Sequence, residues 1–345
     1  MQRIWFNKTF SSITAALQLI RSADVAGEYH LCCSNSHPHA LASVVAHQYE
    51  VEPSGLSRDE YLAWCLDFCR EQNIAIFVPG KEAVQISANR ARFEAQGTRV
   101  LSVASPEVLA LLHDKARFYQ TVQLPMAPPA EFRVVENIEQ FDAAWDELRP
   151  RHAKLCIKPS ISVYGLGFAV IDEDRDSAQL LMQGAQYHVA YQELRRGLQQ
   201  LPEFRTMLLM QYLHGHEYSV DCVGDAGRLV CAVARKKPLT AGHGQLIEMP
   251  AEIEAACRML CDTYQLNGNF NAQFREGSHG IGLLEINPRM SGGIAMACVA
   301  GPNLPYLALR GFDKGFVGLD VPPVRNGIRV AEWSQAVQLP GTADA

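Results

Sequence analysis

Side chains able to do chemistry concentrate between residues 284 and 293, where the sequence reads Leu-Glu-Ile-Asn-Pro-Arg-Met-Ser-Gly-Gly. In a strand, Glu285 and Asn287 project from one face, because successive side chains alternate. A carboxylate beside an amide carbonyl offers hard oxygen ligands, which suit Mg²⁺. Gln273, on the preceding predicted strand, can oppose Glu285 across a hairpin and add a third oxygen. The spacing therefore predicts a metal site of these three residues, and beside it Arg289 can hold a phosphate oxygen.

The run Glu-x-Asn-Pro-Arg resembles the metal-binding signature of the ATP-grasp superfamily. The likeness is strongest to the carbamoyl-phosphate synthetase and biotin carboxylase branch of carboxylate–amine ligases. Asp114-Lys115 resembles the Asp-Lys pair that opens the family's first subdomain, and Lys158 resembles the lysine at the end of an apolar strand. The similarity covers roughly residues 105 to 315, with the parts in the family's order. It implies that Lys115 and Lys158 supply positive charge along a triphosphate.

The loop from Pro159 to Gly167 resembles the family's flexible loop over the phosphates. Gly165 and Gly167 would let the backbone approach a phosphate closely. The first part of the loop departs from the family, which is richer in glycine there, whereas this chain has Ser-Ile-Ser-Val-Tyr at residues 160–164. This departure puts the phosphate contacts of the loop in question and not its place in the fold.

The run Met-Gln-Tyr-Leu at residues 210–213 resembles the family's adenine hinge. The resemblance implies that backbone groups of Gln211, Tyr212 and Leu213 bind the nucleotide, those of Gln211 and Leu213 meeting the amino-pyrimidine edge of adenine. Glu217 takes the place of the acid that accepts hydrogen bonds from the ribose hydroxyls. The expected cofactors are ATP and Mg²⁺, with Mn²⁺ as the alternative metal and two ions in the site.

Arg235 opens the run Arg-Lys-Lys at the end of a predicted strand that in this family lies beside the phosphates. The resemblance therefore implies a phosphate or acyl-phosphate contact for Arg235, and a catalytic set completed by Lys158 and Arg289. Residues 239–246 are expected to form a flap over the site. Within it, His243 is open to two interpretations, an acid or base in the reaction and an ordinary exposed loop histidine.

The resemblance implies an enzyme that joins a small-molecule carboxylate to an amine, or to a thiol, through an acyl phosphate with release of ADP and phosphate. Two alternatives stay open. The departure in the phosphate loop favours a regulatory or scaffold protein with a degenerate nucleotide site, and a small-molecule kinase is the other. A P-loop enzyme is disfavoured, because no Gly-x-x-x-x-Gly-Lys-Ser/Thr occurs. The sequence leaves the oligomeric state open, and a homodimer is the candidate assembly because two-fold dimers are commonest.

The elements that must position these residues indicate a mixed α/β and α+β fold. Short apolar strands alternate with amphipathic helices in the first hundred residues, which predicts a small parallel-sheet N-terminal domain. A two-lobed ATP-grasp unit is expected to follow. The predicted division is a pre-ATP-grasp domain over 1–104, a first subdomain with the phosphate loop over 105–190, and a second subdomain with the metal site and tail over 191–345.

The composition of the chain excludes several classes of protein. The 345 residues carry 31 basic and 37 acidic side chains, a formal net charge of −6, whereas a nucleic-acid-binding protein needs a basic footprint. A hydrophobic share of 48 % is too high for a disordered chain. No apolar run predicts a membrane span or a signal peptide. The ten cysteines form no Cys-x-x-Cys pair, so we expect free buried thiols in a cytoplasmic protein rather than disulfides or zinc.

Overall fold

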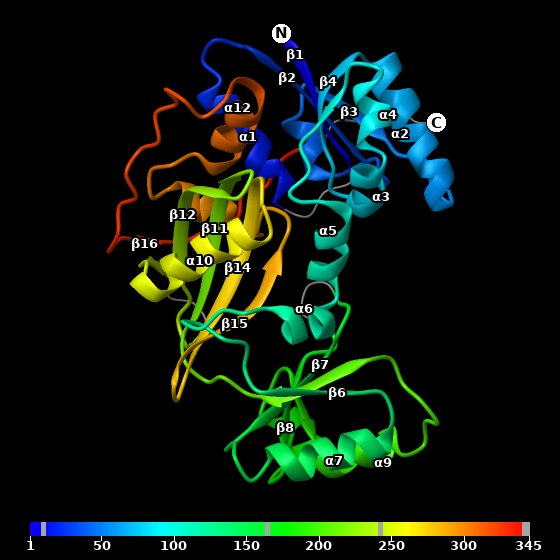
Figure 1. The fold of residues 1–345 in the computed structure, drawn as a ribbon, viewed down its shortest axis with the longest axis vertical. Helices are drawn as coiled ribbons and strands as arrows, with labels where there is room; N and C mark the ends of the chain where they lie inside the picture. The colour runs from blue at the N-terminus through cyan, green and yellow to red at the C-terminus, as the bar shows by residue number, and fades with distance from the viewer. Residues whose placement is uncertain (8–11, 163–165, 241–243, 340–345) are drawn as a thin grey trace. The chain divides into compact units, whose positions relative to one another are not determined.

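The computed structural model describes residues 1–7, 12–162, 166–240 and 244–339 (Figure 1). The chain divides into two compact units, and each is described by itself. Unit 1 comprises residues 1–110, 216–273 and 286–345, and unit 2 comprises residues 111–215 and 274–285. The predicted three-part division at residues 104 and 190 stays a prediction.

Unit 1 begins with a five-stranded parallel sheet in the order β3-β2-β1-β4-β5, as the alternation of strands and helices predicts. Its core includes a stack of Trp5 on Phe77, with ring centroids 4.2 Å apart. Helix α2 begins at a capping box, in which Ser57 and Glu60 satisfy each other's backbone N–H groups. The elements are β1 (Gln2–Phe6), α1 (Ile13–Ala23), β2 (Tyr29–Asn35), η1 (Leu41–Val44), β3 (Gln48–Val51), α2 (Arg58–Glu71), β4 (Ile74–Val78), α3 (Ala83–Ala88), α4 (Arg90–Glu94) and β5 (Arg99–Val100).

A second sheet has six strands in the order β15-β14-β11-β12-β13-β16. Helix α10 packs against β12 through a buried face spaced three and four residues apart, at Ile253, Ala256, Cys257 and Leu260. The elements are β11 (Glu217–Asp225), β12 (Arg228–Lys236), β13 (Gln245–Ile247), α10 (Ala251–Thr263), β14 (Gly268–Gly277), β15 (Gly280–Asn287), α11 (Ile294–Cys298), α12 (Leu304–Lys314) and β16 (Arg329–Val330). Residues 274–285 of this sheet belong to unit 2, and the rest belong to unit 1.

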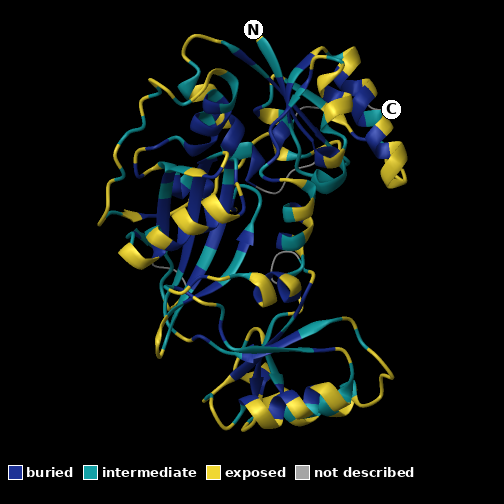
Figure 2. Ribbon diagram, in the orientation of Figure 1, coloured by how far each residue is buried: buried dark blue, intermediate teal, exposed yellow. Residues whose placement is uncertain are grey.

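Unit 2 is built around a five-stranded mixed sheet in the order β6-β10-β7-β8-β9. Helix α7 buries Phe141, Ala144 and Leu148 against this sheet and exposes its other face (Figure 2). The elements are α6 (Lys115–Thr121), β6 (Phe132–Val135), α7 (Ile138–Leu148), β7 (Leu155–Pro159), β8 (Ala169–Asp172), α8 (Ser177–Met182), β9 (His188–Ala190), α9 (Tyr191–Leu198) and β10 (Met207–Gln211). Helix α5 (Pro106–His113) runs from unit 1 into unit 2 along the chain.

Strand β10 ends at Gln211, so Tyr212 and Leu213 of the predicted adenine hinge lie in the loop that follows it. All ten cysteines are free thiols, nine of them buried and Cys298 partly buried. Among the described residues, no helix is both long and apolar enough to cross a membrane.

Candidate active site

Lys158 is fixed inside unit 2 by a tyrosine that the sequence did not single out. Strand β7 carries Lys158, whose Nζ donates to the hydroxyl of Tyr119 at 3.0 Å and to the carbonyl of Leu284 at 3.4 Å. Tyr119 is buried and donates in turn to the same carbonyl. Burial lowers the pKa of Lys158, and the carboxylate of Glu285 opposes that shift. The ammonium is therefore pre-positioned beside the strand that carries the predicted metal ligand.

Lys115 reaches the same carboxylate from helix α6. Its Nζ lies 3.4 Å from Oε2 of Glu285 and donates to the carbonyl of Ser162 at 3.2 Å. Asp114 caps the helix by accepting from the N–H of Ala116 at 3.1 Å. The hydroxyl of Ser160, just beyond β7, donates to the Asp114 carboxylate. These bonds tie the Asp-Lys pair to the end of the strand that carries Lys158, so unit 2 gathers two predicted phosphate cations around one predicted metal ligand.

The predicted adenine hinge is held by bonds within unit 2. The N–H of Gln211 donates to the carbonyl of Glu131 at 2.9 Å, and the N–H of Tyr212 donates to the carbonyl of Lys154 at 3.0 Å. Arg275 lies over the Tyr212 ring and donates to its hydroxyl at 3.2 Å. Leu213 is buried, at 7 % exposure. The hinge is therefore a fixed piece of backbone, which suits the recognition of a planar ring.

The predicted phosphate loop is described only in part. Gly165 and His243 lie outside the described residues, as does the rest of 163–165 and 241–243. Gly167 is described and has a φ of +83°, a conformation that L side chains rarely adopt. A Cβ on Gly167 would stand 2.8 Å from both Pro159 Cγ and Arg205 Nη2. A glycine is therefore needed where the loop returns to the sheet.

Arg235 is held in a buried polar network in unit 1. The residue is 2 % exposed, and its guanidinium donates to Asp221 Oδ2 at 3.0 and 3.1 Å. Further bonds run to Ser219 Oγ at 3.0 Å, Ser291 Oγ at 2.9 Å and Gln245 Oε1 at 2.6 Å. The structure thus shows Arg235 as the partner of a buried carboxylate, and its contact with phosphate stays a prediction.

Gly293 explains part of the Gly-Gly that follows the predicted metal motif. A Cβ at Gly293 would lie 2.4 Å from Nη1 of Arg235, closer than real Cβ contacts come. Because Nη1 is fixed by Gln245, the guanidinium has little room to move away. The glycine therefore keeps space for the arginine, a packing reason that the sequence pattern alone does not reveal.

The remaining predicted metal ligands are ordered by their own neighbours. In unit 1, Gln273 Nε2 donates to Asn271 Oδ1 at 3.3 Å, and Asn271 Nδ2 donates to Asp221 Oδ1 at 3.2 Å. Asn287 Oδ1 accepts from Arg289 Nη2 at 3.3 Å. With its amide nitrogen engaged, Gln273 presents Oε1 as its acceptor.

The predicted metal set is divided between the units. Gln273 and Asn287 belong to unit 1, whereas Glu285 belongs to unit 2. The described residues contain no group of three or more His, Cys, Asp or Glu side chains that could hold a metal. The predicted site relies instead on one carboxylate and two amides, and it stays a prediction.

Glu217, the predicted ribose acid, is ion-paired in unit 1. It begins strand β11, and its Oε1 lies 2.5 Å from Nζ of Lys237. The backbone N–H of Lys237 also donates to the Glu217 carbonyl at 2.7 Å. The ion pair orients the carboxylate, which suits an acceptor of hydroxyl hydrogen bonds.

Two residues of these networks were missed by the sequence analysis. Asp221 shares a strand face with Glu217 and Ser219, and that alternation in the sequence was the available signal for a polar face turned inward. Tyr119 gave no such signal, because an aromatic residue in an apolar helical pattern is typical of core packing. Its hydroxyl acquires a role only once β15 and β7 are both in place.

Comparisons with known proteins show which family and which solved structures this chain is similar to. A family described as ATP-grasp in the biosynthetic pathway with Ter operon matches residues 203–336. A search of curated proteins found no match. Among solved structures, an ADP complex of N5-carboxyaminoimidazole ribonucleotide synthetase is similar at a TM-score of 0.66 and 13 % identity, covering 94 % of this chain and 79 % of that one.

Two further structures have the same fold. An L-amino acid ligase from Bacillus licheniformis matches with a TM-score of 0.63 and 11 % identity, over 93 % of this chain and 78 % of that one. The biotin carboxylase domain of Hydrogenobacter thermophilus 2-oxoglutarate carboxylase, solved with MgADP, ADP and bicarbonate, matches with a TM-score of 0.64 and 13 % identity, over 95 % and 72 %. Residues 203–336 therefore match an ATP-grasp family, and the chain has the fold of these synthetase, ligase and carboxylase structures.

Proposed function

We propose that the chain is an ATP-dependent ligase that joins a carboxylate to an amine through an acyl-phosphate intermediate. The observation that carries the proposal is the cluster in unit 2, where Lys115 and Lys158 converge on Glu285 and on the strand around it. Two lysines around one carboxylate suit a nucleoside triphosphate with its metal. The structural neighbours are named as a synthetase, a ligase and a carboxylase, which supports this class of reaction.

ATP would be bound by the residues that the resemblance assigns. In this proposal, Lys115, Lys158 and the loop with Gly165 and Gly167 hold the phosphates. The hinge of Gln211, Tyr212 and Leu213 meets adenine, and Glu217 meets the ribose. The fixed backbone of the hinge and the ion pair of Glu217 support these roles, because both present their polar atoms in one orientation.

The donor set fits Mg²⁺, or Mn²⁺ in its place. Glu285 supplies a carboxylate, and Gln273 and Asn287 supply amide oxygens, which are the hard ligands that this ion prefers. The amide of Gln273 is already turned by its bond to Asn271. When bound, the metal would neutralise charge on the phosphates, and we propose two ions, as in other phosphoryl-transfer sites.

The protein's own residues position the reactants and exclude water. A substrate carboxylate oxygen attacks the γ-phosphorus, the bond to the β,γ-bridging oxygen breaks, and ADP leaves with that electron pair. The amine nitrogen then attacks the acyl carbon, loses a proton, and phosphate leaves. Arg235 and Arg289 would hold oxygens of the transferring group, and Lys158 the phosphates. Water must be excluded between the two steps, because it hydrolyses an acyl phosphate.

The reaction type is tested by its products. We expect ADP and phosphate to form only when a carboxylate and an amine are both present, measured by chromatography of nucleotides and a phosphate assay over a panel of amino acids and small acids. The same measurement with a thiol in place of the amine distinguishes a carboxylate–thiol ligase from a carboxylate–amine ligase. Formation of AMP and pyrophosphate would contradict the proposal, and a stable phosphorylated product would identify a kinase instead.

Assembly and location follow as part of this proposal. The biotin carboxylase domain of Hydrogenobacter thermophilus is a dimer, and we propose a homodimer here too. A cytoplasmic location would supply ATP and keep the ten free thiols reduced.

A further inference from the structure

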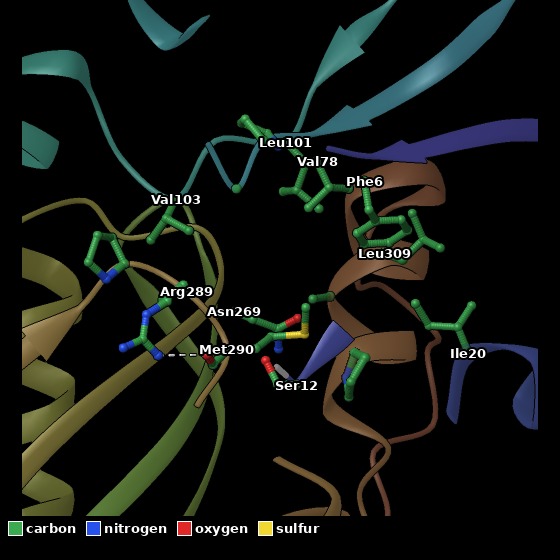
Figure 3. A pocket seen from close by; sticks show the side chains of 15 residues that line it. Phe6, Ser12, Ile20, Val78, Leu101, Val103, Asn269, Arg289, Met290 and Leu309 are labelled. Atoms are coloured by element: carbon green, nitrogen blue, oxygen red, sulfur yellow. Dashed lines mark hydrogen bonds between the residues drawn. The ribbon is translucent and has the colours of Figure 1, made fainter. Parts of the chain in front are cut away.

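A pocket in unit 1 has Arg289, one of the predicted site residues, in its lining. It encloses about 660 Å³, part of it open to solvent, and 15 residues line it (Figure 3). Figure 3 shows Phe6, Val78, Leu101 and Leu309 gathered on one side of the pocket and Arg289 on the other.

The pocket sits where a parallel sheet binds ligands. Phe6 is the last residue of β1, and Val78 is the last residue of β4. In the sheet order β3-β2-β1-β4-β5, the chain continues from β1 to β2 on one side of β1 and later places β4 on its other side. The gap between the carboxyl ends of β1 and β4 is therefore the topological switch point of the sheet. Ligands of open parallel sheets bind in that crevice.

One wall of the pocket is fixed by a buried asparagine. Asn7 has no exposed surface, and its Oδ1 accepts from the N–H of Gly80 at 2.5 Å and of Lys81 at 3.2 Å. Its Nδ2 donates to the hydroxyl of Tyr61 at 3.0 Å. The turn after β4, which lines the pocket, is therefore held in one conformation before any ligand arrives.

The lining has a distinct chemistry. Most of its side chains are aliphatic or aromatic, and Arg289 is the one charged residue among the 15 described residues that line it. Nη1 of Arg289 donates to the Met290 carbonyl at 3.0 Å, and Nη2 donates to Asn287 Oδ1 at 3.3 Å. Asn269, which also lines the pocket, donates through Nδ2 to the Leu304 carbonyl at 3.1 Å.

We infer that this pocket binds the carboxylate substrate, and that this substrate is a monocarboxylate with an apolar, unphosphorylated body. The apolar walls take the body, and the guanidinium of Arg289 takes the carboxylate. Since Arg289 is bonded to Asn287, the carboxylate would be held next to a proposed metal ligand, where it can receive a phosphoryl group. The inference rests on the proposed function for the reaction and on the lining for the substrate class.

The lining also argues against the other substrate classes of the fold. A sugar phosphate would place a dianion and several hydroxyls against apolar side chains with a single cation to meet them. A dicarboxylate would bury a second charge without a partner in the described lining. Both costs are absent for a branched aliphatic or aromatic acid.

Binding without ATP tests the substrate class separately from the reaction. We would titrate the full chain with 3-phenylpropionate, 3-phenylpropionamide and succinate by ligand-observed NMR. The acid should bind at least ~10-fold more tightly than its amide, because it forms charge-assisted bonds with Arg289, and more tightly than succinate. In Arg289→Met the acid and the amide should bind alike.

Substitutions of lining residues that nearly keep the side-chain size distinguish a loss of binding in the pocket from a defect in folding. Val78→Thr and Met290→Gln should each weaken binding of 3-phenylpropionate by about 5- to 10-fold, because each places a polar group against the apolar body. Val317→Thr is the matched control, since Val317 is fully exposed outside the pocket, and it should bind as the parent chain does.

The outcomes test the pocket assignment and the ligase proposal separately. Binding of succinate as tight as that of the acid, or wall variants that bind like the control, would overturn the pocket assignment. If ADP and phosphate then still form with polar carboxylates, the ligase proposal stands alone. If 3-phenylpropionate binds as expected and no ADP forms with any amine, the pocket assignment is supported and the ligase proposal fails.

Discussion

Glu285→Gln is expected to lower the rate of ADP formation by about 10³-fold, the scale of losing one preorganised charge in a phosphoryl-transfer site. The substitution keeps the shape of the side chain and removes its charge. Two effects combine: the predicted metal site loses its carboxylate, and Lys115, now 3.4 Å from Oε2, loses its anionic partner. The charge that opposes the lowering of the Lys158 pKa is lost as well, so that lysine should titrate at a lower pH.

The measurement is the steady-state rate of ADP release as Mg²⁺ is raised, with thermal unfolding as the check on folding. Glu203→Gln is the matched control, because Glu203 is an exposed acid of the same unit. The control should keep the parent rate. A Glu285→Gln chain with full activity would show that the metal assignment is wrong.

Asp221→Asn is expected to have the largest effect on stability, about 3–5 kcal/mol, the cost of leaving one member of a buried ion pair without its partner. Asp221 has no exposed surface, and the Arg235 guanidinium bonded to it is equally enclosed. The variant leaves a buried positive charge with neutral acceptors only. Chemical denaturation followed by far-UV circular dichroism measures the loss.

A second pair in the same hairpin provides the control. Asp225 and Arg228 form an ion pair at 2.7 Å whose side chains are 40 % and 61 % exposed. Asp225→Asn should therefore cost less than about 1 kcal/mol, as exposed pairs do. Equal losses for the two variants would contradict a special role for the buried pair. The double variant Asp221→Asn with Arg235→Met should recover part of the stability, because it removes the uncompensated charge.

The fold was predictable where the local sequence pattern indicates a strand or a helix. The parallel sheet of β1, β2 and β4 follows from three compact apolar runs separated by amphipathic helices. Strands such as β16, at Arg329–Val330, carry no pattern of their own. They form because a partner far away in the chain supplies the hydrogen bonds, as β13 does here. The alternation of apolar and polar side chains that indicates a strand cannot be recognised over only two residues.

The candidate site was predictable as a set of residues and not as a set of contacts. The signature Glu-x-Asn-Pro-Arg and the two lysines pointed to a nucleotide, and the structure brings Lys115 to Glu285. Arg235 is an example. The resemblance implies a phosphate contact for it, which stays a prediction, and the register of β11 and β12 sets it beside Asp221, a buried carboxylate that the sequence analysis did not single out as its partner.

Tracing oxygen from the carboxylate to phosphate tests the central claim most directly. The carboxylate that supports ADP formation would be supplied with both oxygens as ¹⁸O, together with the amine and ATP, and the released phosphate analysed by ³¹P NMR. An acyl-phosphate ligase transfers one ¹⁸O to phosphate in each turnover, because the attacking carboxylate oxygen leaves with the phosphoryl group. Phosphate free of ¹⁸O, formed at the same rate as the ligated product, would contradict the account.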